Sequence, residues 1–227
     1  MLVRERMTAN PVVVHPDTSF EEALQLLREK KIRRLPVVDK SGNLVGIVVE
    51  KDLLYASPSP ATSLSVFEVH YLLAKLQIKD VMTKRVITVG EDCPLEEAAR
   101  IMVEHKIGSL PILRDKKVVG IITETDVFKV MTEALGGNCP QCVRATIRVP
   151  EEKGELAKIA DGIAKLGGNI VSVVTFGMSD SSHREITLKV TGLKRDAMQK
   201  VFDNTDAQVI DLRESGQPYQ PLLVSTR

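Results

Sequence analysis

Thr123 and Asp126 are candidates for binding a small molecule, because they stand where the sequence predicts the N-terminus of a helix. The free N–H groups and the dipole at such an end favour an anion. A carboxylate can also accept hydrogen bonds from both hydroxyls of a cis-diol. Thr-x-x-Asp is equally an ordinary helix cap. The two residues by themselves therefore leave binding and capping open.

The elements that position this pair belong to an internal repeat of about 50 residues. An offset of 75 residues aligns the first half of one copy with the other, and a single deletion changes the offset to 74. The aligned segments are Met7-Thr8 with Met82-Thr83, Asp17 with Asp92, residues 21–23 with 96–98, 32–37 with 107–112, Gly46-Ile47 with Gly120-Ile121, and Asp52 with Asp126. So many matches indicate a duplicated unit.

Each copy predicts the order β-α-β-β-α. The first helix has Thr18 as its expected N-cap, with Glu21 at capping-box spacing. Its apolar face repeats at helical intervals, and in the second copy Pro94 suits the first helical position. The face consists of Phe20, Ala23, Leu24 and Leu27. The expected strands are 12–14, 35–38 and 44–49 in one copy, and 86–89, 110–113 and 118–123 in the other, each set followed by a helix near Asp52 or Asp126.

The whole pattern resembles the two CBS motifs of a Bateman module. The resemblance covers about residues 1–135 and rests on the start "MTxxxxxV", the step "I-x-x-L-P-V/I" and the ending "G-I-x-x-E-x-D", each present twice in order. It implies a pseudo-two-fold disc with clefts between the copies. Such clefts commonly bind AMP, ADP, ATP or S-adenosylmethionine and pass a signal to an attached or partner protein.

The resemblance also implies roles for particular residues. In the family's segment G-h-x-S/T-x-x-D the hydroxyl contacts phosphate and the carboxylate contacts ribose, which implies these roles for Thr123 and Asp126. The small residues Gly108 and Ser109 leave room for a base or ribose to approach the backbone. The further nucleotide-site candidates are Pro111, Ile87 and Thr88.

The first copy departs from this segment. It keeps Asp52 but has Val49 where the second copy has Thr123, and valine can neither cap a helix nor contact phosphate. Arg33 and Arg34 are opposite Gly108-Ser109 in the repeat, and they either supply phosphate contacts instead or form a solvated basic edge. We therefore expect one good cleft around Thr123 and Asp126 and a weaker one around Asp52.

A connector and a third domain complete the chain. Residues 56–61 have linker composition, and a helix should follow whose single apolar face packs within the chain or, alternatively, against a partner helix. That face comprises Val66, Val69, Leu72, Leu73 and Leu76. After Gly136-Gly137, residues 144–149, 154–166, 170–176, 184–191, 195–202 and 207–212 read as β-α-β-β-α-β, the ferredoxin-like order. Leu156, Ile159, Ala160 and Ile163 should face inward from the first of these helices.

This third region resembles an ACT domain, on the strings Val149–Leu156 and Leu166–Ile170. In that family these turns flank an amino-acid pocket, usually at a subunit interface. Glu151 replaces the family's Asp and Lys153 its Pro, whereas Gly154, Leu156 and Asn169 are retained. These three are the amino-acid-site candidates, and Asn169 can alternatively bond its own turn. A CBS pair joined to an ACT domain resembles regulatory proteins of the acetoin-utilisation type.

The predicted organisation is thus an α+β chain. Its segments are repeat one (1–56), a connector with a helix (57–79), repeat two (80–135), a hinge (136–142), the ACT-like domain (143–213) and a tail (214–227).

Cys139 and Cys142 lie in the hinge at Cys-x-x-Cys spacing. They can be inert thiols, half of a zinc site shared between two protomers, or a redox pair. No second pair is present to complete four zinc ligands within one chain. Three cysteines without a disulfide framework favour a reducing compartment.

Composition narrows the function classes. The chain has 31 basic and 30 acidic residues and 4% aromatics, so nothing favours binding to nucleic acid or an anionic membrane. No apolar run approaches the roughly 20 residues that span a bilayer, and the N-terminus lacks a signal-peptide pattern. We therefore predict a cytoplasmic location.

No nucleophile elbow, P-loop or dinucleotide fingerprint occurs in the sequence, so we predict no enzyme and no catalytic cofactor. The leading interpretation is a regulatory homodimer, or higher homo-oligomer, that senses an adenine nucleotide and, through the ACT unit, an amino acid. The alternatives are an adaptor with empty clefts and a Cys-x-x-Cys metal or redox protein.

Overall fold

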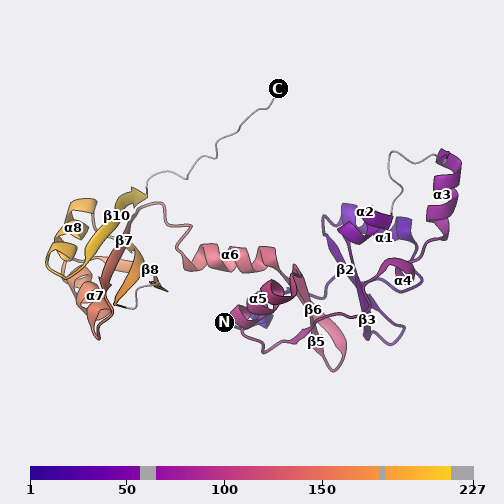
Figure 1. Cartoon of the computed structure of the whole chain (residues 1–227), viewed down its shortest axis with the longest axis horizontal. Helices are drawn as coiled ribbons and strands as arrows, with labels where there is room; N and C mark the ends of the chain where they lie inside the picture. Colours follow the sequence, from indigo (N-terminus) through magenta and orange to yellow (C-terminus); the bar gives the residue numbers. More distant parts are fainter. Residues whose placement is uncertain (57–64, 179–181, 216–227) are drawn as a thin grey trace. The chain divides into compact units, whose positions relative to one another are not determined.

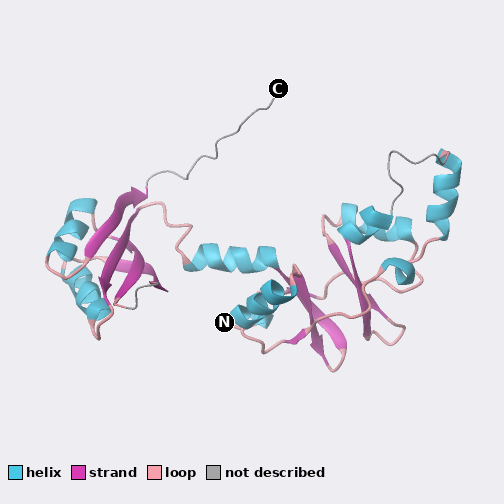
Figure 2. Cartoon of the chain, in the orientation of Figure 1, coloured by secondary structure: helices cyan, strands magenta, loops and turns pink. Residues whose placement is uncertain are grey.

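A computed structural model describes residues 1–56, 65–178 and 182–215. The chain divides into two compact units, Met1–Phe128 and Lys129–Arg227. Both units contain helices and antiparallel strand pairs (Figure 2), which confirms the predicted α+β class. Among the described residues, no helix has both the length and the apolar character that crossing a membrane requires.

The first repeat packs two helices on a two-stranded hairpin. Its elements are α1 (Phe20–Glu29), β2 (Arg34–Val38), β3 (Leu44–Val49) and α2 (Glu50–Ala56). Both helices lie along the antiparallel β2–β3 pair (Figure 1). Phe20, Ala23 and Leu27 are buried at the centre of the core, and Leu24 packs at its margin, as the helical spacing predicts.

The second repeat contains β4 (Val89–Gly90), α5 (Leu95–His105), β5 (Ser109–Arg114), β6 (Lys117–Thr123) and α6 (Glu124–Ala134). Its sheet has the order β1-β6-β5-β4. The strand β1 (Thr8–Ala9) comes from the start of the chain, where a 3-10 helix (Val3–Glu5) precedes it. The second repeat therefore takes its edge strand from the segment that leads into the first.

The exchange is reciprocal. Thr8 pairs with Ile121 of the second repeat, and Thr83 pairs with Ile47 of the first. Thr8 and Thr83 are equivalent positions of the duplication. Because each repeat borrows the leading segment of the other, the two repeats form one folded unit, and clefts between them are built from both.

Two local details differ from the sequence prediction. The N-cap of α1 is Ser19, whose hydroxyl accepts from the Glu22 N–H at 3.2 Å, because the Thr18 hydroxyl accepts from His15 instead. Pro94 is likewise the N-cap of α5 and not its first residue.

The expected first strands are also much shorter than predicted. Residues 12–14 contribute one bridge, from Val14 to Val37, and residues 86–89 contribute only their last residue, in β4. Each of these segments makes only a short parallel contact at the edge of a hairpin. The run of apolar residues therefore predicted a longer strand than the structure contains.

The connector forms α3 (Val66–Lys75) and α4 (Ile78–Val81). Leu73 and Leu76 pack against the core of the first repeat. Leu72 is 52% exposed, contrary to its predicted place on the buried face. The side chains of Val66 and Val69 and all of residues 57–64 lie outside the described part of the chain.

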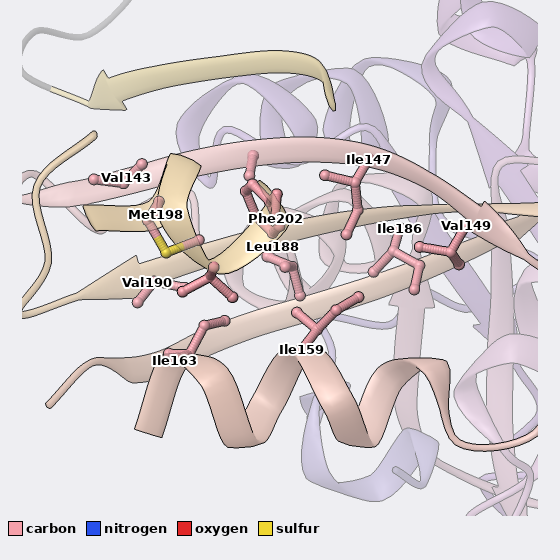
Figure 3. Close-up of a cluster of buried hydrophobic side chains, with 12 residues drawn as sticks. Val143, Ile147, Val149, Ile159, Ile163, Ile186, Leu188, Val190, Met198 and Phe202 are labelled. Atoms are coloured by element: carbon pink, nitrogen blue, oxygen red, sulfur yellow. The ribbon is translucent and has the colours of Figure 1, made fainter. Parts of the chain in front are cut away.

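The second unit confirms the ferredoxin-like arrangement. Its elements are β7 (Cys142–Pro150), α7 (Glu155–Lys165), β8 (Asn169–Gly177), β9 (His183–Thr191), α8 (Arg195–Asp203) and β10 (Gln208–Ser215). The antiparallel sheet has the order β10-β7-β9-β8. Ile159 and Ile163 point from α7 toward the sheet, where Phe202 of α8 joins them (Figure 3). Leu156 is 40% exposed, so its predicted inward position is wrong.

Candidate ligand-binding cleft

A cleft of about 440 Å³ lies between the two repeats, within the size range of small-molecule sites. Four segments line it. The first repeat contributes Arg33, Arg34, Ile47, Val49, Glu50, Lys51 and Asp52, and the second contributes Thr83, Arg85, Val86, Ile87, Lys106, Ile107, Gly108 and Ser109.

Asp52 stands in the first turn of α2, directly after β3. Its Oδ2 accepts a hydrogen bond from the Val49 N–H at 3.0 Å, which fixes the carboxylate at the helix N-terminus. An ionised carboxylate has about four lone-pair sites, so capping leaves acceptor capacity on this group. Val49 therefore lacks the hydroxyl that the motif has at this position, while the Asp52 carboxylate keeps its place in the cap.

Arg33 and Arg34 extend from the start of β2 toward the second repeat. Arg33 Nη2 donates to the Thr125 hydroxyl at 3.3 Å, and Arg34 Nη2 lies 3.9 Å from Glu124 Oε2. The Arg34 side chain is only 16% exposed. Burial lowers the pKa of its guanidinium, and the neighbouring charge of Arg33 lowers it further. Arg34 is thus held in the cleft wall, whereas Arg33 is exposed at its rim. The choice between a binding role and a solvated basic edge stays open.

Gly108 makes room for this arrangement. A Cβ atom at this position would collide with the Arg34 guanidinium and the Glu124 carboxylate. The absent side chain therefore serves the approach of an arginine from the other repeat. Ser109 is buried beside it, opposite Thr123 in the β5–β6 ladder.

Thr123 and Asp126 lie in the geometry of a helix cap. Asp126 Oδ2 accepts from the Thr123 N–H at 3.0 Å and from its hydroxyl at 2.7 Å, while the Asp126 N–H donates to that hydroxyl at 3.4 Å. Neither residue lines the described cleft, and neither do Thr88 and Pro111. Their part in ligand binding stays a prediction.

The cleft brings together six of the ten predicted nucleotide-site residues. They are Arg33, Arg34, Asp52, Ile87, Gly108 and Ser109. The sequence grouped Gly108 and Ser109 with Thr123 and Asp126 of their own repeat. Ser109 does pair with Thr123, but Gly108 and Ser109 also line the cleft that contains Asp52. The exchange of leading segments brings the Thr83–Ile87 stretch to the same cleft.

Three basic lining residues were missed by the sequence prediction: Lys51, Arg85 and Lys106. The available signal was their position next to motif residues, since Arg85 follows Met82-Thr83 and Lys106 precedes Ile107-Gly108. Lys106 ends α5 in the left-handed conformation, with a φ of 53°. Its repeat equivalent Lys31 has the same conformation, with a φ of 52°.

The amino-acid-site candidates separate in the second unit. Gly154 and Leu156 line a cavity of about 610 Å³ at the start of α7, but Asn169 does not line it. Glu151, which stands for the family's Asp, is paired with Arg184 across this cavity at 2.5 Å, and that hydrogen bond lowers the pKa of Glu151. The Asn169 carbonyl accepts from the Thr191 hydroxyl at 3.4 Å.

Cys139 and Cys142 form a disulfide. The turn between α6 and β7 brings their Cα atoms to 5.7 Å, within disulfide range. Of the three alternatives, free thiols do not describe this bonded pair, and a redox role stays a prediction. Zinc binds thiolates, and a disulfide offers none. Among the described residues, no group of three or more His, Cys, Asp or Glu side chains could hold a metal ion.

Known families match the whole arrangement. The CBS domain model matches residues 3–59 and 78–133. The model of the TTHA0829-like ACT domain matches residues 141–213. The chain therefore belongs to the CBS-domain family, with a tandem pair followed by an ACT domain. The resemblance found in the sequence is confirmed.

Individual relatives match the CBS pair. A CBS domain-containing protein of Dictyostelium discoideum, DDB_G0289609, is 31% identical over 142 residues, which cover 62% of this chain and 98% of the relative. The solved structure of a protein of Vibrio cholerae designated AcuB, for acetoin utilization, has 30% identity and a TM-score of 0.51, covering 61% of this chain and 95% of its own.

The solved CBS domain pair of protein MJ0100, in complex with 5'-methylthioadenosine and S-adenosyl-L-methionine, is 31% identical with a TM-score of 0.49 and covers 61% of this chain and 98% of its own.

Proposed function

We propose that this protein is a non-catalytic regulator whose CBS pair binds an adenine nucleotide in the cleft around Asp52. The observation that carries the proposal is the joint placement of the Asp52 carboxylate with the guanidinium groups of Arg33 and Arg34 in a cleft of about 440 Å³. A carboxylate suits the hydroxyls of a ribose, and guanidinium groups suit phosphate.

Each group has a role in the proposed complex. Asp52, fixed by the Val49 N–H, accepts from the ribose hydroxyls. Arg33 and Arg34 contact phosphate, and Ile87 supplies apolar surface to the base. Binding regulates an attached or partner protein only if the nucleotide prefers one conformation of the pair over another. Thr123 and Asp126 stay the proposed second position for a nucleotide.

Thermal unfolding of the full chain with AMP, ADP, ATP or S-adenosylmethionine tests the proposal. A ligand at 100 times its Kd stabilises the folded state by about 2.7 kcal/mol, which raises the melting temperature by several degrees. Failure of every adenosine compound to shift the transition would contradict the proposal and favour the adaptor alternative. Sedimentation of the same samples measures the predicted homodimer or higher oligomer.

An amino acid is the second candidate ligand. The cavity at the start of α7 favours it, because Gly154 and Leu156 of the family's turn line that cavity. Gly154 has a φ of 96°, a conformation that favours glycine. Calorimetry with a panel of amino acids should show saturable heat in the parent protein and none in Gly154→Val.

A further inference from the structure

The cleft around Asp52 is strongly basic. Five cations line it against two carboxylates, a net charge of +3. The cations are Arg33, Arg34, Lys51, Arg85 and Lys106, and the carboxylates are Glu50 and Asp52. A concave surface with one sign of charge and apolar walls raises the local concentration of ligands of opposite sign.

Close ion pairs offset little of this charge among the described residues, although the carboxylates of Glu124 and Asp126 both act on Arg34. Arg33 bonds a neutral hydroxyl, and Arg34 lies at the long distance of 3.9 Å from Glu124. Asp52 is engaged with a backbone N–H. Within the described ranges, no carboxylate forms an ion pair with Arg85 or Lys106. Burial and the adjacent charge of Arg33 both disfavour the charged form of Arg34. A bound anion would offset this repulsion between the two arginines.

The charge is specific to this side of the duplication. The repeat equivalent of Arg85 is Asn10, and that of Lys51 is Thr125. Only Lys106 has a basic equivalent, Lys31. Basic residues that served only to keep the surface solvated would be expected equally often at both members of each pair of equivalent positions. The added cations belong to the cleft that retains Asp52 and lacks the motif hydroxyl.

These observations define the ligand class, on the premise of the proposed nucleotide site. We infer that the Asp52 cleft selects an adenosine ligand with two or more phosphates, ADP or ATP, over AMP, and rejects S-adenosylmethionine. A di- or triphosphate presents several negative charges to cations from separate segments, whereas a monophosphate reaches fewer of them. The sulfonium of S-adenosylmethionine is a cation and is repelled by the same groups.

Calorimetry on the full chain at low and at raised salt tests the inference with ATP, ADP, AMP and S-adenosylmethionine. We expect ATP to bind at least tenfold more tightly than AMP, with no measurable S-adenosylmethionine binding. The difference should shrink at raised salt, because solvent-exposed charges are screened. Arg85→Gln and Lys106→Gln should each weaken ATP binding about tenfold, and should weaken ATP binding more than AMP binding.

Lys31→Gln is the matched control for Lys106→Gln. Both lysines have the left-handed conformation, so the backbone cost of the substitution is equal. Lys31 does not line the cleft, and its variant should bind ATP like the parent. The melting temperature of each unliganded variant reports whether it folds.

The outcomes separate the inference from its premise. Equal affinity for ATP, AMP and S-adenosylmethionine would overturn the inference while the proposed function stands. Equal losses of ATP affinity in Lys106→Gln and Lys31→Gln would also overturn it. No binding of any adenosine compound would remove both.

Discussion

The two repeats end in the same cap but in different surroundings. Asp52 Oδ2 accepts from the Val49 N–H at 3.0 Å, and Asp126 Oδ2 accepts from the Thr123 N–H at 3.0 Å. Only the second repeat adds a hydroxyl to this cap, and only the first faces the described basic cleft. The carboxylate of the motif therefore serves the fold in both repeats. We propose that its role in ligand binding depends on which residues the other repeat places opposite.

Exchanging each carboxylate for alanine should give the largest difference between the two repeats. Asp52→Ala should weaken nucleotide binding on the order of 100-fold, or about 2.8 kcal/mol, because the ribose hydroxyls lose their acceptor. Asp126→Ala should change it less than threefold. Both variants lose a helix cap, so each serves as the other's stability control in calorimetry. The reverse ranking would restore the preference that the motif sequence alone predicts for Thr123 and Asp126.

Removing the hydroxyl from the second repeat, or adding one to the first, tests what the hydroxyl contributes. Thr123→Val removes the bond to Asp126 and should destabilise the first unit by about 1 kcal/mol, a fall of about 3 °C in melting temperature. The affinity of Thr123→Val for nucleotide in the Asp52 cleft should not change.

Val49→Thr adds a hydroxyl to the first repeat. It should add a phosphate contact and raise nucleotide affinity a few-fold. Unchanged affinity in Val49→Thr would show that the arginines replace the hydroxyl completely.

The smallest expected difference is an ion pair on the first repeat. Lys79 Nζ donates to Asp17 Oδ1 at 2.9 Å, and this bond lowers the pKa of Asp17 below 3.8. Because the carboxyl pKa is lower in the folded state, the ion pair stabilises the fold at pH values above the pKa of the unfolded chain. This contribution is lost as the pH falls through the folded-state pKa. Thermal melts of Lys79→Gln between pH 6 and about pH 3 should therefore converge on the parent at low pH. A constant offset at all pH values would contradict this.

Much of the fold follows from local pattern. Apolar spacing placed α1 and α7 to within a residue or two, since the faces that hold Phe20 and Ile159 repeat at helical intervals. The choice of Ser19 over Thr18 as a cap depends on which hydroxyl the preceding turn uses, and composition does not encode that. The disulfide likewise depends on the path of the turn between α6 and β7.

The site was less predictable than the elements. Each motif residue was found from the repeat, but the partners of Asp52 come from residues 83–87 and 106–109 of the other copy. Alignment of the two repeats shows which positions are equivalent. It does not show which residues are in contact in the folded protein. The basic residues Arg85 and Lys106 carry no motif signature, so only their placement in the cleft distinguishes them from solvated lysines and arginines.

The borrowed edge strand also constrains how the chain can be made. Thr8 leaves the ribosome early, yet its partner Ile121 is synthesised 113 residues later. At typical elongation rates this is a delay on the order of ten seconds. During that interval the β2–β3 hairpin can form, since its strands are adjacent in sequence, while the sheet of the second repeat cannot be completed. The first repeat can therefore begin to fold well before the second, although the two have nearly the same structure in the finished protein.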